Sequence, residues 1–99
     1  MDSRASRANR AILRRIVMIV NQRGLHARAA ARFVKLAAGF SANITVAKNG
    51  TEVSGLSIMG LMMLAAGPGT AIEIRASGKD AAAALAALDT LIANKFDEE

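Results

Sequence analysis

The chain has 99 residues, of which 53% are hydrophobic and 21% are charged, and it contains no cysteine. This size and composition suit one small domain with a single core, and they exclude a disulfide framework and thiol chemistry. No stretch approaches the roughly 20 apolar residues of a membrane span, and the first residues lack the apolar core of a signal peptide. We therefore expect a cytoplasmic protein that does not insert into a membrane.

The net charge of +5 is concentrated at the start of the chain. Residues 1–15 carry five arginines and one aspartate, whereas all later residues carry eight basic and seven acidic groups. A nearly neutral domain with three phenylalanines and no Trp or Tyr argues against a nucleic-acid partner, which calls for a basic face and stacking aromatic rings. We expect residues 1–11 to be a flexible basic extension or the product of a misassigned start codon, and residues 12–99 to form the domain.

The first half of the domain predicts a strand, a helix and a β-hairpin. The elements are a strand over 13–20, a helix over 27–38 and two strands over 43–48 and 51–53. Asn49-Gly50 separates the last two strands and is the strongest short hairpin signal that a sequence offers. The helix carries an apolar stripe at helical spacing, formed by Ala30, Phe33, Val34 and Ala37.

The second half predicts a short helix, a strand and a long helix. These elements span 57–65, 70–76 and the residues after Asp80, which is expected to cap the long helix. In the short helix, Ile58, Leu61 and Ala65 share one face and Met59 and Met62 lie off it. Side chains expected to face the core are Ile72, Ile74 and Ala76 on the strand and Leu85, Leu88, Ile92 and Phe96 on the long helix. The order β-α-β-β-α-β-α predicts a two-layer α+β domain.

The only histidine of the chain, His26, lies in Gly24-Leu25-His26-Ala27-Arg28, where the predicted helix begins. A helix N-terminus presents unpaired N–H groups and the positive end of the helix dipole, so it favours an anion. An imidazole at this place could accept a phosphoryl group, and the Arg28 guanidinium could bind the same oxygens. The alternative is a capping or packing histidine, for which a polar residue such as asparagine would serve as well.

Arg28, Arg32 and Lys35 recur at i, i+4 and i+7 and therefore share one face of the same helix. Such a basic face is either a solvated helix surface or a docking face for acidic partners. The nearby histidine favours docking. A metal site is not expected, because one histidine and scattered carboxylates do not form a ligand set.

Ser57 stands at the start of the short helix, where serine is a favoured N-cap. Phosphorylation of Ser57 would add negative charge beside apolar residues and could block partner binding without disrupting the helix. Met59 and Met62 either fill the core or form an exposed, adaptable docking patch together with Ile58.

Two motifs in register resemble the HPr family, the histidine-containing phosphocarriers of the phosphoenolpyruvate-dependent phosphotransferase system. Gly24-Leu25-His26-Ala27-Arg28 is similar to the active-site motif, and Ser57-Ile58-Met59-Gly60-Leu61-Met62 is similar to the regulatory-serine helix. The likeness extends through Gly69-Thr70-Ala71-Ile72-Glu73-Ile74 and covers roughly residues 13–97. Ala29 stands where most members have proline, from which we expect a looser site and transfer slowed by about tenfold or less. The resemblance implies an open-faced sandwich, with a four-stranded antiparallel sheet and three helices on one face.

The resemblance also implies a role. His26 would accept a phosphoryl group through Nδ1 from Enzyme I, charged by phosphoenolpyruvate, and pass it to EIIA-type domains. Arg28 would stabilise the group, Ser57 would be the substrate of an HPr kinase/phosphorylase, and the docking surface would combine Arg28, Arg32, Lys35, Ile58, Met59 and Met62. The protein would be a monomeric carrier without a cofactor rather than an enzyme, in a sugar-uptake or a regulatory, nitrogen-related branch.

Two other functions remain open from the sequence. One is a regulatory docking protein of the same fold, in which Ser57 rather than His26 is the switch. The other is an RNA- or membrane-surface-binding module that acts through the arginine-rich start of the chain.

Overall fold

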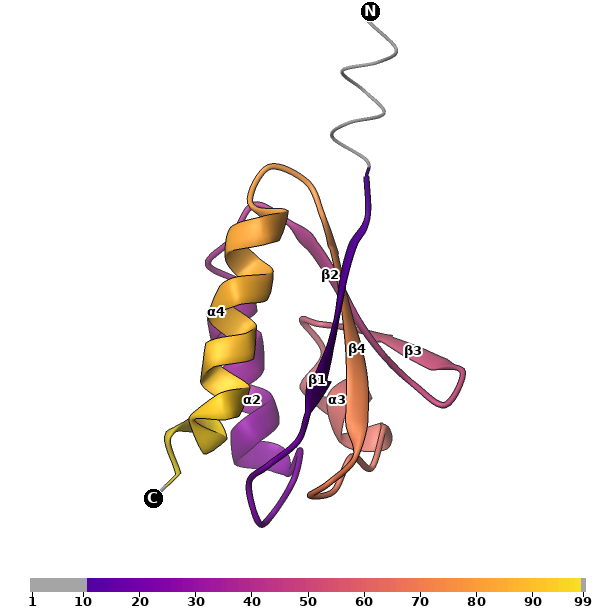
Figure 1. The fold of residues 1–99 in the computed structure, drawn as a ribbon, viewed down its shortest axis with the longest axis vertical. Helices are drawn as coiled ribbons and strands as arrows, with labels where there is room; N and C mark the ends of the chain where they lie inside the picture. Colours follow the sequence, from indigo (N-terminus) through magenta and orange to yellow (C-terminus); the bar gives the residue numbers. More distant parts are fainter. Residues whose placement is uncertain (1–10, 99) are drawn as a thin grey trace, which may run out of the picture.

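A computed structural model describes residues 11–98, which form a four-stranded antiparallel sheet with helices on one face (Figure 1). The strands are β1 Leu13–Met18, β2 Asn43–Lys48, β3 Thr51–Ser54 and β4 Ala71–Ser77. The helices are α2 Ala27–Ala37, α3 Ile58–Met63 and α4 Ala81–Ala93, followed by a 3₁₀ turn, η1 Lys95–Asp97. The predicted α+β fold and its β-α-β-β-α-β-α order are confirmed. The predicted basic extension lies, except for Ala11, outside the described residues.

The strand order β1-β4-β2-β3 places β4 in the middle, between the first strand and the hairpin. Val17 pairs with Ile72, and Val46 pairs with Ile74, so the apolar alternation of three strands falls in register on the helix-covered face. Ile72, Ile74 and Ala76 are at most 1% exposed, as the alternation predicted.

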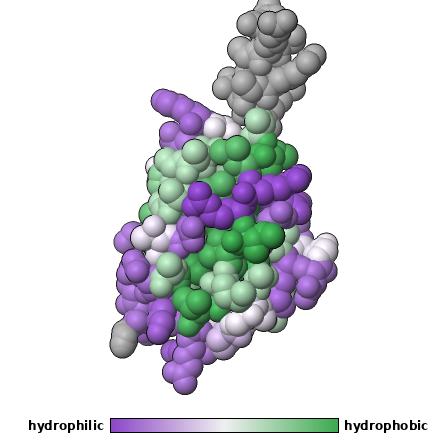
Figure 2. Space-filling model, viewed as in Figure 1, coloured by the Kyte–Doolittle hydropathy of each residue, from purple (hydrophilic) through white to green (hydrophobic). Residues whose placement is uncertain are grey.

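No helix within residues 11–98 covers the outer face of the sheet. Arg75 bridges two carboxylates on it, with Nη1 2.9 Å from Glu52 Oε2 and Nη2 2.7 Å from Glu73 Oε1. Several apolar side chains at and beside β1 are also exposed, including Ile16 at 73% and Met18 at 50%. Figure 2 accordingly shows a hydrophilic band between two hydrophobic areas of the surface.

The core lies between the sheet and the helices. Small alanines let α4 approach β1 and β4 closely, and α2 packs against α3 and α4. The buried residues of the two helices are Ala29, Ala30, Phe33 and Ala37 on α2 and Ala81, Ala84, Leu85, Leu88 and Ile92 on α4. Val34, predicted in the apolar stripe, is only partly buried against this core.

The three residues predicted to share one face of the short helix, Ile58, Leu61 and Ala65, lie in different environments. Leu61 and Leu64 are buried, but Ile58 is 41% exposed. Ala65 has a left-handed backbone, with φ 52°, because α3 ends at Met63 and the chain has already left the helix. The six-residue helix is too short to carry a stripe from Ile58 to Ala65.

Several element ends, one helix cap and the position of Phe96 also differ from the prediction. Strand β1 ends at Met18 and helix α2 ends at Ala37. Asp80 occupies the N-cap position of α4, but its carboxylate accepts a hydrogen bond from the Ser41 N–H (2.8 Å) and caps no group of its own helix. Phe96 is buried, yet it lies beyond α4 in a left-handed turn, so its burial does not come from helical spacing.

Among the described residues, no helix combines the length and the apolar character that crossing a bilayer would require.

Candidate functional site

His26 occupies the N-cap position of α2, at the end of the loop that leaves β1. The Leu25 N–H donates to the Ala66 carbonyl (2.9 Å) and fixes this loop against the segment before β4. The His26 backbone is extended, and its carbonyl accepts from the Ala30 N–H (2.8 Å), while its imidazole makes no capping bond. The His26 backbone therefore caps the helix, and the imidazole is available for other contacts.

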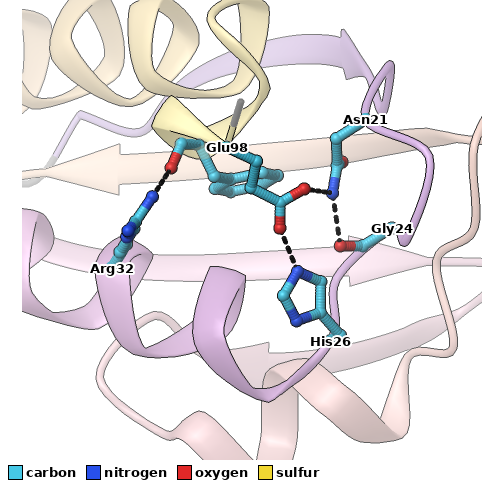
Figure 3. A network of polar contacts seen from close by, with 6 residues as sticks. Asn21, Gly24, His26, Arg32 and Glu98 are labelled. Carbon is cyan, nitrogen blue, oxygen red and sulfur yellow. Dashed lines mark hydrogen bonds and ion pairs between the residues drawn. The ribbon is translucent and has the colours of Figure 1, made fainter.

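The imidazole contacts the C-terminal part of the chain (Figure 3). His26 Nε2 bonds to Glu98 Oε2, and Asn21 Nδ2 donates both to Glu98 Oε1 (3.0 Å) and to the Gly24 carbonyl (2.8 Å). The side chains of His26 and Glu98 are 17% and 22% exposed, so the pair is sheltered but accessible. The predicted motif around His26 thus forms a hydrogen bond with the carboxylate of Glu98, which lies 72 positions later in the chain.

A polar hollow of about 450 Å³ lies beside this pair. Its lining residues are Asn21, Gln22, Arg23, Arg28, Arg32, Lys95, Asp97 and Glu98. Four of them are basic and two are acidic, so the surroundings of His26 favour an anion. Arg28 and Arg32 both border this hollow, as their spacing of one helical turn predicted.

Arg32 also has a structural role, because its guanidinium Nη1 donates to the Phe96 carbonyl. Together with Lys35 it borders a second, larger groove of about 990 Å³ between α2 and α4. The apolar part of the predicted docking surface lies on α3, which packs against α2 and β3.

Ser57 is the N-cap of α3, where its Oγ accepts from the Gly60 N–H (2.9 Å). The apolar residues after it are exposed at the surface: Ile58 at 41%, Met59 at 69% and Met62 at 39%. Core filling is thus wrong for the two methionines, and an accessible apolar patch remains. His26 and Ser57 begin two helices, α2 and α3, that pack against each other.

The sequence did not single out Asn21 or Glu98. Asn21 ends an apolar stretch and resembles an ordinary loop residue, yet it is 1% exposed. Glu98 reaches His26 because Lys95, Phe96 and Asp97 all adopt positive φ values and turn the chain back. The residue types give little signal for such a turn, since Lys95 and Phe96 are of types that rarely adopt a left-handed backbone and only Asp97 is of a type that sometimes does. Within 11–98, no three His, Cys, Asp or Glu residues gather into a group that could hold a metal ion.

Comparison with known proteins identifies the family. Residues 13–94 match the family model described as the PTS HPr component phosphorylation site. The phosphocarrier protein HPr of Neisseria meningitidis serogroup A is 47% identical over 87 residues, which are 88% of this chain and 98% of that protein. The chain belongs to the HPr family.

Its HPr-family relatives agree in sequence and in structure. The phosphocarrier protein NPr of Shewanella violacea is 45% identical, over 87% of this chain and 94% of that protein. The crystal structure of HPr-C-His from Thermoanaerobacter tengcongensis superposes with a TM-score of 0.84 at 42% identity, covering 88% of this chain and 98% of that one. The protein is accordingly a phosphocarrier of the phosphotransferase system and not an enzyme with its own turnover.

Acid should break the contacts of the Glu98 carboxylate with His26 and Asn21 in this HPr-family protein. Hydrogen bonds from His26 and Asn21, together with the charges of His26 and Arg23, hold the pKa of Glu98 below its ordinary value of 4.5. A carboxyl group whose pKa is lowered by folding stabilises the folded contact above its ordinary pKa, and that stabilisation is lost as pH falls through the lowered value. We expect the Asn21 side-chain amide resonances to shift below pH 4.5. The same titration of Glu98→Gln should be flat, and a Glu98 carboxyl that titrates above 4.5 would contradict this expectation.

Proposed function

We propose that His26 is the phosphoryl acceptor, charged by Enzyme I with phosphate from phosphoenolpyruvate and discharged to EIIA-type domains. The observation that carries this proposal is the position of the chain's only histidine at the N-terminus of α2, inside the region that matches the family's phosphorylation-site model. The extended N-cap backbone presents the ring at the surface of the site, and the basic hollow beside it favours an incoming phosphoryl group.

The environment fits the charge that develops during transfer. In phosphoryl transfer, negative charge spreads over the phosphoryl oxygens, and catalysis is mainly positioning and electrostatic stabilisation. The N–H groups in the first turn of α2 have no helical carbonyl as a partner. Arg28 is exposed and borders the hollow, so its guanidinium can reach the same oxygens.

The experiment is a charging assay on the whole chain. Incubation with Enzyme I and phosphoenolpyruvate should add one phosphoryl group, read by intact mass, and brief acid should remove it, because a phosphoramidate is acid-labile. A known HPr carrier in the same reaction verifies that Enzyme I is active. The proposal would be overturned if Enzyme I phosphorylated the control carrier but not this chain. A phosphate on this chain that is stable to acid would also overturn it.

Transfer of the phosphoryl group to EIIA domains tests which branch of the phosphotransferase system this protein serves. The curated relatives include proteins named HPr and NPr at 47% and 45% identity, so we propose EIIA-type acceptors of the sugar-uptake branch, of the nitrogen-related branch, or of both. The charged protein is mixed with an EIIA domain of each branch, and the loss of its phosphoryl group is followed by mass. Discharge to neither domain would contradict the carrier role proposed here.

The apolar patch of Ile58, Met59 and Met62 is proposed as part of the surface that meets these partners. Met59→Glu places a charge at a side chain that is 69% exposed, so the fold should be unaffected. We expect the Enzyme I concentration needed for half-maximal charging to rise about tenfold, a typical cost for the loss of one interface anchor. Ile16→Glu is the matched control, since Ile16 is 73% exposed on the uncovered face of the sheet. If Met59→Glu and Ile16→Glu had equal effects on this concentration, the apolar patch would not be part of the docking surface.

Ser57 is proposed as a regulatory phosphorylation site, acted on by an HPr kinase/phosphorylase. Its Oγ caps α3 immediately before the apolar patch. A phosphate at this helix N-terminus would be favoured by the helix dipole. The same phosphate would place about two negative charges beside apolar docking residues. Phosphorylation would therefore preserve the helix and weaken docking.

A further inference from the structure

The C-terminal segment after α4 is held firmly over His26. Phe96 is completely buried, and its carbonyl accepts a hydrogen bond from Arg32. Lys95, Phe96 and Asp97 have φ values of 58°, 57° and 59°, which reverse the chain direction. Glu98 therefore approaches the imidazole from an anchored turn, and its carboxylate reaches His26 at low cost in conformational entropy.

Asn21 fixes the position of that carboxylate. Its side chain is 1% exposed, and its Nδ2 group donates to both the Gly24 carbonyl and Glu98 Oε1. The opposite amide orientation would direct the Asn21 oxygen at two acceptor oxygens, so the hydrogen-bond partners determine the orientation. Asn21 thus links the backbone of the His26 loop to Glu98.

The chemistry of the pair determines which ring nitrogen carries the proton. An ionised carboxylate only accepts hydrogen bonds. Hydrogen bonds from His26 and Asn21 hold the pKa of Glu98 below its ordinary value, so the group is ionised at neutral pH. His26 Nε2 must therefore carry a hydrogen, and in the neutral ring the lone pair is on Nδ1. Figure 3 shows the second ring nitrogen facing away from Glu98.

We propose that Glu98, held by Asn21, is a positioning residue for phosphoryl transfer: it keeps the proton on His26 Nε2 and directs the Nδ1 lone pair outward. This inference rests on the proposed function of His26. The Nδ1 lone pair forms the new bond to phosphorus, while the bond from phosphorus to the donor group of Enzyme I breaks and leaves its electron pair on the donor. Nε2 retains its hydrogen, and the positive charge that the ring gains faces the Glu98 carboxylate.

The preorganised carboxylate stabilises this charge where it develops, as the carboxylate of a hydrolase triad stabilises its imidazolium. The phosphoryl group is attached to the opposite side of the ring, so it does not displace Glu98. A glutamine in the same place has one acceptor oxygen, so it keeps the bond from His26 Nε2 by giving up the bond from Asn21 Nδ2, and it loses the charge stabilisation. Orientation and charge can therefore be separated by substitution.

The test uses Glu98→Ala, Glu98→Gln and the control Asp89→Ala, whose exposed carboxylate pairs with Arg15 and is not among the residues that line the hollow. ¹⁵N spectra of the imidazole in the unphosphorylated protein are recorded at about pH 8.5, roughly two units above the ordinary pKa of a histidine. The initial rate of charging by Enzyme I is measured in parallel. Asn21 is left unchanged, because its burial makes folding sensitive to substitution.

The parent should show its ring hydrogen on Nε2 alone, and Glu98→Gln should keep that signature with a rate lower by about threefold. Glu98→Ala should mix the two tautomers and lower the rate by about tenfold, whereas Asp89→Ala should stay within about twofold of the parent. A parent hydrogen on Nδ1, or a Glu98→Ala rate within about twofold of the parent, would overturn the inference. A parent that is not charged at all refutes the acceptor role of His26, and the spectra still show whether Glu98 fixes the ring.

Discussion

Replacing His26 with alanine should abolish phosphoryl uptake and leave the fold intact. The imidazole is the only one in the chain, so no second side chain of this kind can replace it. Its backbone, and not its ring, makes the capping bond to Ala30, and alanine supplies the same backbone carbonyl. Charging by Enzyme I, read by intact mass, should fall by more than about 10³-fold, because the nucleophile itself is absent.

His26→Asn distinguishes this role from capping. Asparagine is a preferred N-cap residue, so a capping histidine would be replaced without loss. The phosphoryl-acceptor role predicts that His26→Asn is as inactive as His26→Ala, although its helix is at least as stable. A His26→Asn protein that Enzyme I still phosphorylates would contradict the acceptor role. Loss of function in Ser57→Ala with normal function in His26→Ala would instead support a docking protein switched at Ser57.

Gly24→Ala should destabilise the domain by about 3 kcal/mol or more, since it combines backbone strain with a steric clash. Gly24 has φ +65°, and a Cβ added there would lie 2.4 Å from the Ala66 carbonyl oxygen and 2.9 Å from Gly67 Cα. Both neighbours are backbone atoms, and the same carbonyl accepts the bond from the Leu25 N–H, so relief requires the His26 loop to move. Urea denaturation should show a lower midpoint, and charging should slow as well.

Gly50→Ala is the matched control for this substitution. Gly50 also has a left-handed backbone, with φ +83°, but no atom lies within 4 Å of an added Cβ. The cost should be about 1 kcal/mol, the conformational penalty alone. If the two variants unfold at the same urea concentration, the contact of Gly24 with Ala66 is not what requires glycine.

The parts of the fold that could be predicted are those in which a local pattern and the core agree. Alternation in 70–76 predicted which residues face the helices, because one face of β4 is completely covered. Asn49-Gly50 predicted the hairpin, since both residues adopt the positive φ values that a tight hairpin turn needs. The short helix was less predictable, because a six-residue element packs few residues, and its tertiary neighbours decide which side is buried.

Half of the candidate site could be predicted in the same way. His26 and Arg28 belong to one local motif at a helix start, and sequence spacing determines their proximity. Glu98 reaches that motif through a left-handed turn, and Asn21 takes part because its loop is buried. Neither event has a local sequence signal, so no periodicity in the chain indicates the network.

The order of the strands has a consequence for how the domain assembles. The β2–β3 hairpin is local in sequence and can form early, whereas β1 is an edge strand that must await β4, with Leu13 pairing with Ala76. The loop after β1, which leads to His26, is tied to the segment before β4 by the bond between Leu25 and Ala66. Closing so long a stretch of chain carries an entropic cost before its contacts are made. His26, the proposed phosphoryl acceptor, should therefore acquire its surroundings late in folding, and we expect that Enzyme I does not phosphorylate a partly folded chain.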